Sequence, residues 1–154
     1  MLRLSKLTDY AVVVLIRLSD AERMAAVGVQ TAPGIATATG VPEPTVSKVL
    51  KALAGAGLVV SQRGARGGYR LARPLHAVSV ADVIAAIDGP IALTACVDGG
   101  TGGCDVQSMC VVKGRWDLVN DAIHAALTGI SLTDMRAATI PRAFRLRETL
   151  SAAE

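Results

Sequence analysis

The sequence predicts a mainly α-helical fold with one small β-hairpin. Apolar residues recur at helical spacing in several segments, most regularly at Val46, Val49, Leu50 and Leu53. One region departs from that period. Two short strand-like runs, residues 58–63 and 69–72, flank a turn over residues 64–68 that contains three glycines. A chain of 154 residues has room for one domain with its own core, or for a small domain with an extension.

The first predicted helix begins near Ser5 or Thr8, either of which can cap it. Residues 11–18 are apolar on most sides, so we expect this helix to be buried against more than one neighbour. Residues 20–31 are predicted to form a connector.

Two further helices are predicted to form a helix-turn-helix. The first spans residues 33–39, and Gly40 ends it in a left-handed turn. The second begins at about residue 44, and Gly55 or Gly57 ends it. Its apolar face is opposed by polar and basic side chains at Thr45, Ser47, Lys48 and Lys51. A tight glycine-containing turn between two helices, the second polar on its outer side, is typical of that motif.

The β-hairpin that follows is predicted to be a wing. Its tip is expected to carry Arg63, Arg66 and Arg70. Together with the two preceding helices, this makes the fold class a winged helix-turn-helix.

The second half of the chain is predicted to be helical on both sides of a glycine-rich loop. Ser79 caps a helix that the sequence Asp-Gly-Pro ends at residues 88–90. After Cys110, a longer helix carrying Trp116, in the core or at a dimer seam, runs to about Leu127. A short helix starts at Ser131, and residues 139–154 are expected to be a flexible tail.

Charge is distributed unevenly along the chain. Residues 1–73 hold ten basic and four acidic residues, whereas residues 74–154 hold six and nine. No acidic residue occurs between Pro44 and Ala81. A basic segment on one side of a molecule indicates a polyanionic partner. The alternative is an ordinary solvated face.

Composition favours a protein with an additional buried interface. Apolar residues make up 51% of the chain, yet no apolar run approaches the ~18 residues of a membrane span. The first six residues hold two charges and no apolar stretch typical of a secretory signal follows them. We therefore expect a cytoplasmic protein without a membrane anchor, which most simply forms a homodimer.

All three cysteines fall within residues 96–110, which we call the cysteine segment. Four glycines lie between Cys96 and Cys104, and Cys110 closes the segment. Thiolates select zinc, copper(I) or iron–sulfur clusters. Three thiols leave one over after a disulfide forms and are one short of a four-ligand site. The alternatives are a disulfide with a spare thiol, or three unrelated cysteines.

The combined motifs resemble the Rrf-two family of bacterial transcription regulators. The resemblance covers roughly residues 1–138 and is carried by the Leu-Thr-Asp-Tyr sequence at residues 7–10, the wing sequence Arg-Gly-Ala-Arg-Gly-Gly-Tyr-Arg-Leu and the three cysteines. It is strongest to regulators of SUF iron–sulfur assembly and implies a homodimer that binds double-stranded DNA at a pseudo-palindromic operator. It also implies long C-terminal dimerisation helices and an iron–sulfur cluster, [2Fe-2S] or [4Fe-4S], that changes DNA affinity.

The resemblance assigns a role to each part of the chain. Residues 1–75 are the expected DNA-binding region, residues 76–138 the cluster loop and dimerisation helix, and residues 139–154 the tail. At the start of the recognition helix, Thr45, Ser47 and Lys48 are candidates for base contacts, with Lys51 also facing DNA. The three wing arginines are expected at phosphates or in the minor groove.

The fourth cluster ligand is the point at which this chain departs from IscR-like members. Lys113 stands where they have a histidine, and the loop between the first two cysteines is about two residues longer. In NsrR-like members an aspartate of the first helix reaches the cluster of the other subunit, which points to Asp9 here. Alternatively, Asp9 only stabilises the positive end of its helix. His76 and His124 are expected to be surface or interface residues.

The function expected is that of a regulator, most simply a repressor, whose DNA affinity is controlled by the cluster and whose targets are cluster-assembly genes. A nitric oxide sensor or a thiol or zinc redox switch on the same scaffold is an alternative. So is an iron–sulfur carrier, although a carrier has no use for a recognition helix. Cysteine-based enzyme chemistry needs a base next to the thiol, and no histidine neighbours the cysteines in sequence.

Overall fold

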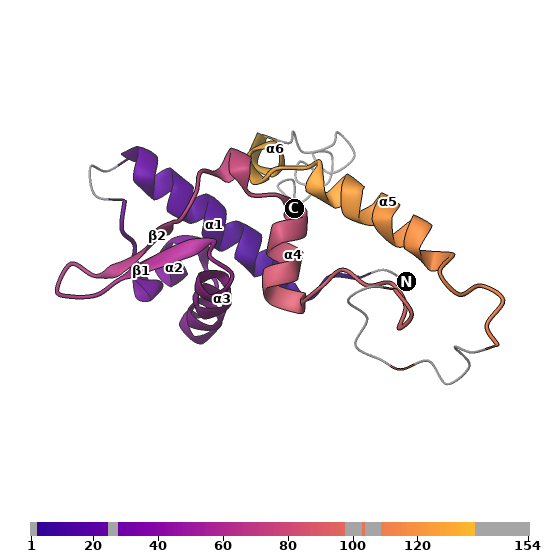
Figure 1. Cartoon of the computed structure of the whole chain (residues 1–154). Coiled ribbons are helices and arrows are strands. Elements are labelled where there is room, and N and C mark those ends of the chain that lie inside the picture. The colour runs from indigo at the N-terminus through magenta and orange to yellow at the C-terminus, as the bar shows by residue number, and fades with distance from the viewer. Residues whose placement is uncertain (1–2, 25–27, 98–102, 104–108, 138–154) are drawn as a thin grey trace, which may run out of the picture.

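The computed structural model describes residues 3–24, 28–97, 103 and 109–137 (Figure 1). It confirms a mainly α-helical fold with one two-stranded antiparallel hairpin. In chain order, the elements are α1 Lys6–Met24, α2 Ala32–Thr39, α3 Glu43–Gly55, β1 Val59–Gln62, β2 Gly68–Leu71, the short 3₁₀ helix η1 Leu75–Ala77, α4 Val80–Asp88, α5 Trp116–Thr128 and α6 Leu132–Ala137.

Helix α1 is the centre of the fold. It packs against α2, α3, α4, α6 and the hairpin, as expected for a helix that is apolar on most sides. Its side chains at Ala11, Val14, Leu15 and Leu18 are completely buried. The same core takes in α4 and the first residue of α6, because Val83 and Leu132 are also inaccessible to solvent.

The prediction of a connector over residues 20–31 was wrong about where it starts, because α1 continues to Met24. A tertiary contact holds this last part of the helix. Glu22 Oε1 accepts a hydrogen bond from the Leu71 backbone N–H at 3.1 Å, so α1 is tied to the base of the hairpin.

The helix predicted to start after Cys110 begins only at Trp116. Residues 111–115 form turns instead, and Gly114 has φ +73°, a left-handed conformation that interrupts a right-handed helix. Helix α5 is therefore 13 residues long.

Backbone pairing joins the end of α5 to the start of α4. The Val80 N–H donates to the Ile130 carbonyl at 2.9 Å, and the Leu132 N–H donates to the Val78 carbonyl at 2.9 Å. The Ser79 hydroxyl caps α4 by accepting a hydrogen bond from the Asp82 N–H, and the Asp82 carboxylate accepts one from the Ser79 N–H. This capping box confirms the cap predicted at Ser79. None of the helices in the described ranges is both long enough and apolar enough to cross a membrane.

Candidate nucleic-acid interface and candidate metal centre

The turn between α2 and α3 is fixed by local signals in the sequence. Thr31 caps α2 through a hydrogen bond from the Gly34 N–H to its hydroxyl at 3.2 Å. Gly40 ends the helix with φ +74°, and its N–H bonds to the Ala36 carbonyl. The predicted helix-turn-helix is thus present, with α2 and α3 packed on each other and on α1.

The polar side of α3 faces solvent because its opposite side packs into the core. Val46, Val49, Leu50 and Leu53 are buried. Ser47, Lys48 and Lys51 are exposed, as the helical spacing predicted. Thr45 differs, because it is half-buried; it lies in the first turn of α3, where its N–H donates to the Pro42 carbonyl at 2.9 Å.

Close backbone packing sets the shape of the hairpin. A Cβ added at Gly68 would lie 2.6 Å from the Gln30 carbonyl oxygen, and one at Gly67 would lie 2.5 Å from the Gln62 carbonyl oxygen. Gln30 approaches this closely because its backbone pairs with Tyr69 through bonds of 2.7 and 2.9 Å. Gly68 therefore allows the wing to dock on the segment before α2, and Gly67 allows the hairpin turn to close on itself.

The wing arginines are exposed, but one does not lie where the sequence predicted. Arg63 and Arg66 lie between the two strands, at the tip. Arg70 lies within β2, directly opposite Val60, because the paired strands end at Gln62 and Gly68. In the described part of the chain, none of the three arginines forms an ion pair with an acidic side chain.

These six side chains form what we call the basic surface: Ser47, Lys48 and Lys51 on α3, with Arg63, Arg66 and Arg70 on the hairpin. Helix α3 packs against β1, so the two parts are neighbours. Figure 1 shows the hairpin extending from the end of the molecule opposite to the N-terminal end of α5. The arrangement suits contact with one extended polyanion.

The cysteine segment follows α4, and two of its three thiols lie within the described residues. Cys96 is half-buried in a turn, and its Sγ lies 3.2 Å from the Thr94 hydroxyl. Cys110 is also half-buried, and both thiols are free. Cys104 lies outside the described residues. Free, partly accessible thiols are available as soft-metal ligands, so the donor chemistry fits an iron–sulfur cluster.

Asn120, which the sequence did not single out, holds the stretch of chain that leads to this segment. Asn120 of α5 is 9% exposed, and its Oδ1 accepts a hydrogen bond from the Leu93 N–H at 3.1 Å. The irregular chain that leads into the cysteine segment is therefore held against α5 at Leu93. An asparagine within an amphipathic helix pattern gives no signal of such a distant partner.

Asp9, the predicted fourth ligand, lies in the first turn of α1 and is exposed. It borders a surface hollow of about 280 Å³ between the start of α1 and α4. Within the described ranges, no three His, Cys, Asp or Glu side chains are gathered closely enough to hold a metal ion. One chain thus does not bring Asp9 together with Cys96 and Cys110, so the ligand role requires a second subunit.

Comparison with known proteins identifies the scaffold. A family model described as "Rrf2: Iron-dependent Transcriptional regulator" matches residues 4–138. The chain belongs to the Rrf2 family. It is therefore a DNA-binding transcription regulator and not an enzyme, as the sequence predicted.

Similar proteins support the same assignment for this Rrf2-family chain. Protein aau3 of Rhizobium meliloti is 31% identical over 135 residues, covering 87% of this chain and 84% of that protein. The solved structure of T. potens IscR is 28% identical with a TM-score of 0.60, covering 94% and 96%. CymR of B. subtilis, a global cysteine regulator, has a TM-score of 0.63 at 24% identity, covering 91% and 100%, and is similar in fold.

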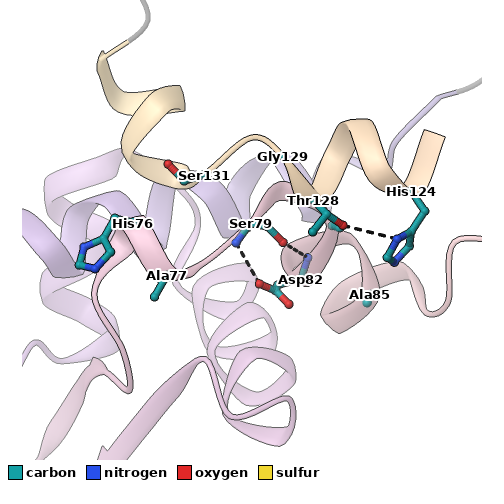
Figure 2. Close-up of a pocket in the computed structure, with 10 residues that line it drawn as sticks. His76, Ala77, Ser79, Asp82, Ala85, His124, Thr128, Gly129 and Ser131 are labelled. Carbon is teal, nitrogen blue, oxygen red and sulfur yellow. Dashed lines mark hydrogen bonds between the residues drawn. The ribbon is translucent and has the colours of Figure 1, made fainter. Parts of the chain in front are cut away.

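The two histidines of this Rrf2-family protein line one surface hollow of about 490 Å³ (Figure 2). His76 is in η1 and His124 is on α5, and both are exposed, as expected for surface residues. The His124 ring contacts the Thr128 hydroxyl at 3.4 Å. Lys113, at the position where IscR-like members have a histidine, is also exposed.

Proposed function

We propose that this protein is a homodimer whose affinity for operator DNA is set by an iron–sulfur cluster held by Cys96, Cys104 and Cys110, with Asp9 of the other subunit as fourth ligand. The observation that carries the proposal is that one small fold has both an exposed basic surface and free cysteine thiols, at Cys96 and Cys110, in the chain between α4 and α5. Its similarity to IscR supports cluster-assembly genes as targets. Such a regulator acts in the cytoplasm, where the DNA is.

The proposed homodimer forms through α5. One side of this helix, with Asn120, Ile123 and Leu127, packs toward the rest of the chain. The opposite side is an exposed apolar stripe formed by Leu118, Val119, Ala122, Ala125 and Ala126. Leu118 is 78% exposed. A continuous apolar stripe of this kind marks an interaction surface, and small alanines allow two helices to approach closely. A second copy of α5 is the occupant that fits both features.

Two copies of the basic surface then face DNA together. Helix-turn-helix dimers bind half-sites about 34–36 Å apart, one helical turn of DNA, so a two-fold symmetric protein predicts a pseudo-palindromic operator. Within each half-site, Lys48 and its neighbours at the start of α3 enter the major groove. The wing arginines neutralise phosphates beside it.

The cluster would supply a reversible change in charge and geometry at the cysteine segment. Thiolate ligands from three cysteines suit iron, whereas the Asp9 carboxylate is a harder and weaker ligand. The weakly held iron is the site at which an oxidant or nitric oxide would react. The same residues would also support a zinc or thiol switch, and the visible absorbance of anaerobically purified protein distinguishes these alternatives.

Arg66→Ala should weaken DNA binding for all sequences and reduce its dependence on salt. Arg66 lies at the exposed wing tip, where a phosphate contact would release counterions. Each lost phosphate contact lowers the slope of log affinity against log salt by about 0.9, so a dimer should lose about two units. Fluorescence anisotropy on the chain's own upstream DNA, in a series of salt concentrations, measures both quantities.

The matched control for this variant is Arg136→Ala, which removes the same charge from α6, where Arg136 pairs with Asp20 at 3.5 Å. It should leave the salt slope as it is. An unchanged slope and affinity in Arg66→Ala would show that the wing does not contact DNA.

Lys48→Ala should change sequence preference more than it changes the salt slope. Its side chain is exposed near the start of α3, where recognition helices contact base edges. Losing a good base contact costs about 1–3 kcal/mol of discrimination at one position of each half-site. Selection from a randomised operator library measures this. A preference identical to the wild-type preference would remove Lys48 from base recognition.

A further inference from the structure

A hydrogen-bonded joint connects the first turn of α1 to the last residue of α4. Asp88 Oδ2 accepts a hydrogen bond from the Thr8 hydroxyl at 2.6 Å and another from the Ser5 backbone N–H at 3.4 Å. Thr8 is 2% exposed, so its hydroxyl is satisfied inside the protein. The partners are 80 residues apart in sequence.

The electrostatics show that the Asp88 carboxylate stabilises the start of α1 rather than the end of its own helix, α4. A carboxylate at the C-terminal end of a helix is repelled by the helix dipole, and one at an N-terminal end is stabilised. Asp88 ends α4 and faces the start of α1. Burial raises the pKa of this carboxyl, but the hydrogen bonds from Thr8 and Ser5 outweigh it, so its pKa lies below the ordinary value.

Local capping of α1 does not explain the joint. Ser5 already caps the helix, because its Oγ accepts from the Thr8 N–H at 3.2 Å. The Thr8 hydroxyl is therefore left to bond Asp88. Directly after Asp88, Gly89 has φ +90° and turns the chain away from α4 toward the cysteine segment.

The joint connects residues that adjoin the two proposed metal centres of the dimer. Thr8 is adjacent to Asp9, and Asp88 is eight residues before Cys96. The two hydrogen bonds to Asp88 thus hold the turn that carries the proposed fourth ligand against the end of α4, from which the chain leads to the cysteine segment. A shift at either place must be accommodated at the other.

We propose that Asp88 is a positioning residue that, through Thr8, holds the first turn of α1 so that Asp9 reaches the cluster of the partner subunit. This role rests on the proposed function. In the dimer, the end of α4, from which the chain leads to each subunit's own cysteine segment, is joined to the turn that completes the other subunit's site. The two sites are consequently coupled through Thr8 and Asp88.

The test compares Thr8→Val and Asp88→Ala with Asp134→Ala. Asp134 is a matched control, because its Oδ2 accepts from the Ser131 N–H at 2.9 Å and the Ser131 hydroxyl at 2.6 Å, within one helix start. Cluster lifetime is followed by visible absorbance after adding an iron chelator anaerobically. Backbone hydrogen exchange of residues 5–9 is measured in the cluster-free protein.

Thr8→Val should shorten the cluster lifetime by about fivefold, the size expected when one intramolecular hydrogen bond is lost, and Asp88→Ala, which also removes the bond from Ser5, by at least as much. Both variants should also speed exchange of residues 5–9, with the affinity of cluster-free protein for DNA unchanged. Asp134→Ala should alter neither lifetime nor exchange there. Adding Asp88→Ala to Asp9→Ala should give no further loss of lifetime, because both act through one ligand.

Two failures are distinguishable. A wild-type protein that holds no cluster overturns the proposed function and this role with it. A wild-type protein with a cluster whose lifetime is the same in Asp88→Ala, or falls equally in Asp134→Ala, overturns only the positioning role. Additive effects of Asp9→Ala and Asp88→Ala would also contradict it.

Discussion

Leu118→Glu should convert the protein to a monomer and abolish high-affinity operator binding. Leu118 is 78% exposed in one chain, and the proposed symmetric interface would bury it twice. Burying a leucine contributes about 1.5–3 kcal/mol, so losing two weakens the dimer by about 3–6 kcal/mol, roughly 10²–10⁴ in dissociation constant. Two carboxylates in an apolar interface weaken it further. Analytical ultracentrifugation measures the change.

The control for this prediction is His124→Glu, which places the same charge on the side of α5 that lines the hollow in Figure 2. It should remain a dimer and bind DNA. The affinity of Leu118→Glu for operator DNA should fall to that of one subunit for a single half-site, because a monomer carries only one basic surface. A fully dimeric Leu118→Glu would show that the apolar stripe of α5 is not the interface.

Cys110→Ser should remove the cluster while leaving the fold and the dimer intact. Cys110 is half-buried between turns, and the neighbouring Met109 and Val111 are each 84% exposed, so its thiol contributes little packing. Cluster-dependent DNA affinity should disappear, a change of about 1–3 kcal/mol if the coupling is of ordinary allosteric size. Cys104→Ser should behave in the same way. Visible absorbance, circular dichroism and DNA anisotropy measure the three properties.

Met109→Ser is the matched control for the cysteine variants, because it removes an exposed thioether from the same turn and should keep the cluster. A Cys110→Ser protein that is unfolded at room temperature would contradict the account. It would show that the metal builds the fold, as in zinc-dependent domains.

Elements governed by local periodicity could be predicted from the sequence. The buried face of α3 follows the 3.6-residue spacing of Val46, Val49, Leu50 and Leu53, so the exposure of Lys48 and Lys51 follows as well. Gly40, Ser79 and Gly89 marked helix ends through chemistry that acts within a few residues.

Features that depend on distant partners could not be predicted. Helix α1 continues to Met24 in a region where Glu22 bonds Leu71, and Asn120 bonds Leu93 across a stretch that includes the cysteine segment. The Thr8–Asp88 joint has no sequence signal, because both residues read as ordinary helix ends. The position of Arg70 depended on strand register, which residue pattern fixed only to within one or two residues.

The ligand set of the proposed site includes two thiols that the structure describes. Cys96 and Cys110 have free thiols at the ends of the cysteine segment, and Cys104 and the tail over residues 139–154 lie outside the described residues. Asp9 has the exposure that a ligand supplied to a second subunit requires.

One measurement tests the central claim most directly. It is the affinity of anaerobically purified protein for the DNA upstream of its own gene, measured on the same preparation before and after cluster removal. The wild-type protein should show visible absorbance and a DNA affinity that changes about 5–150-fold when the absorbance is lost, with dimer content constant. Wild-type protein that is colourless, or whose DNA affinity is identical with and without the cluster, would contradict control of this regulator by an iron–sulfur cluster.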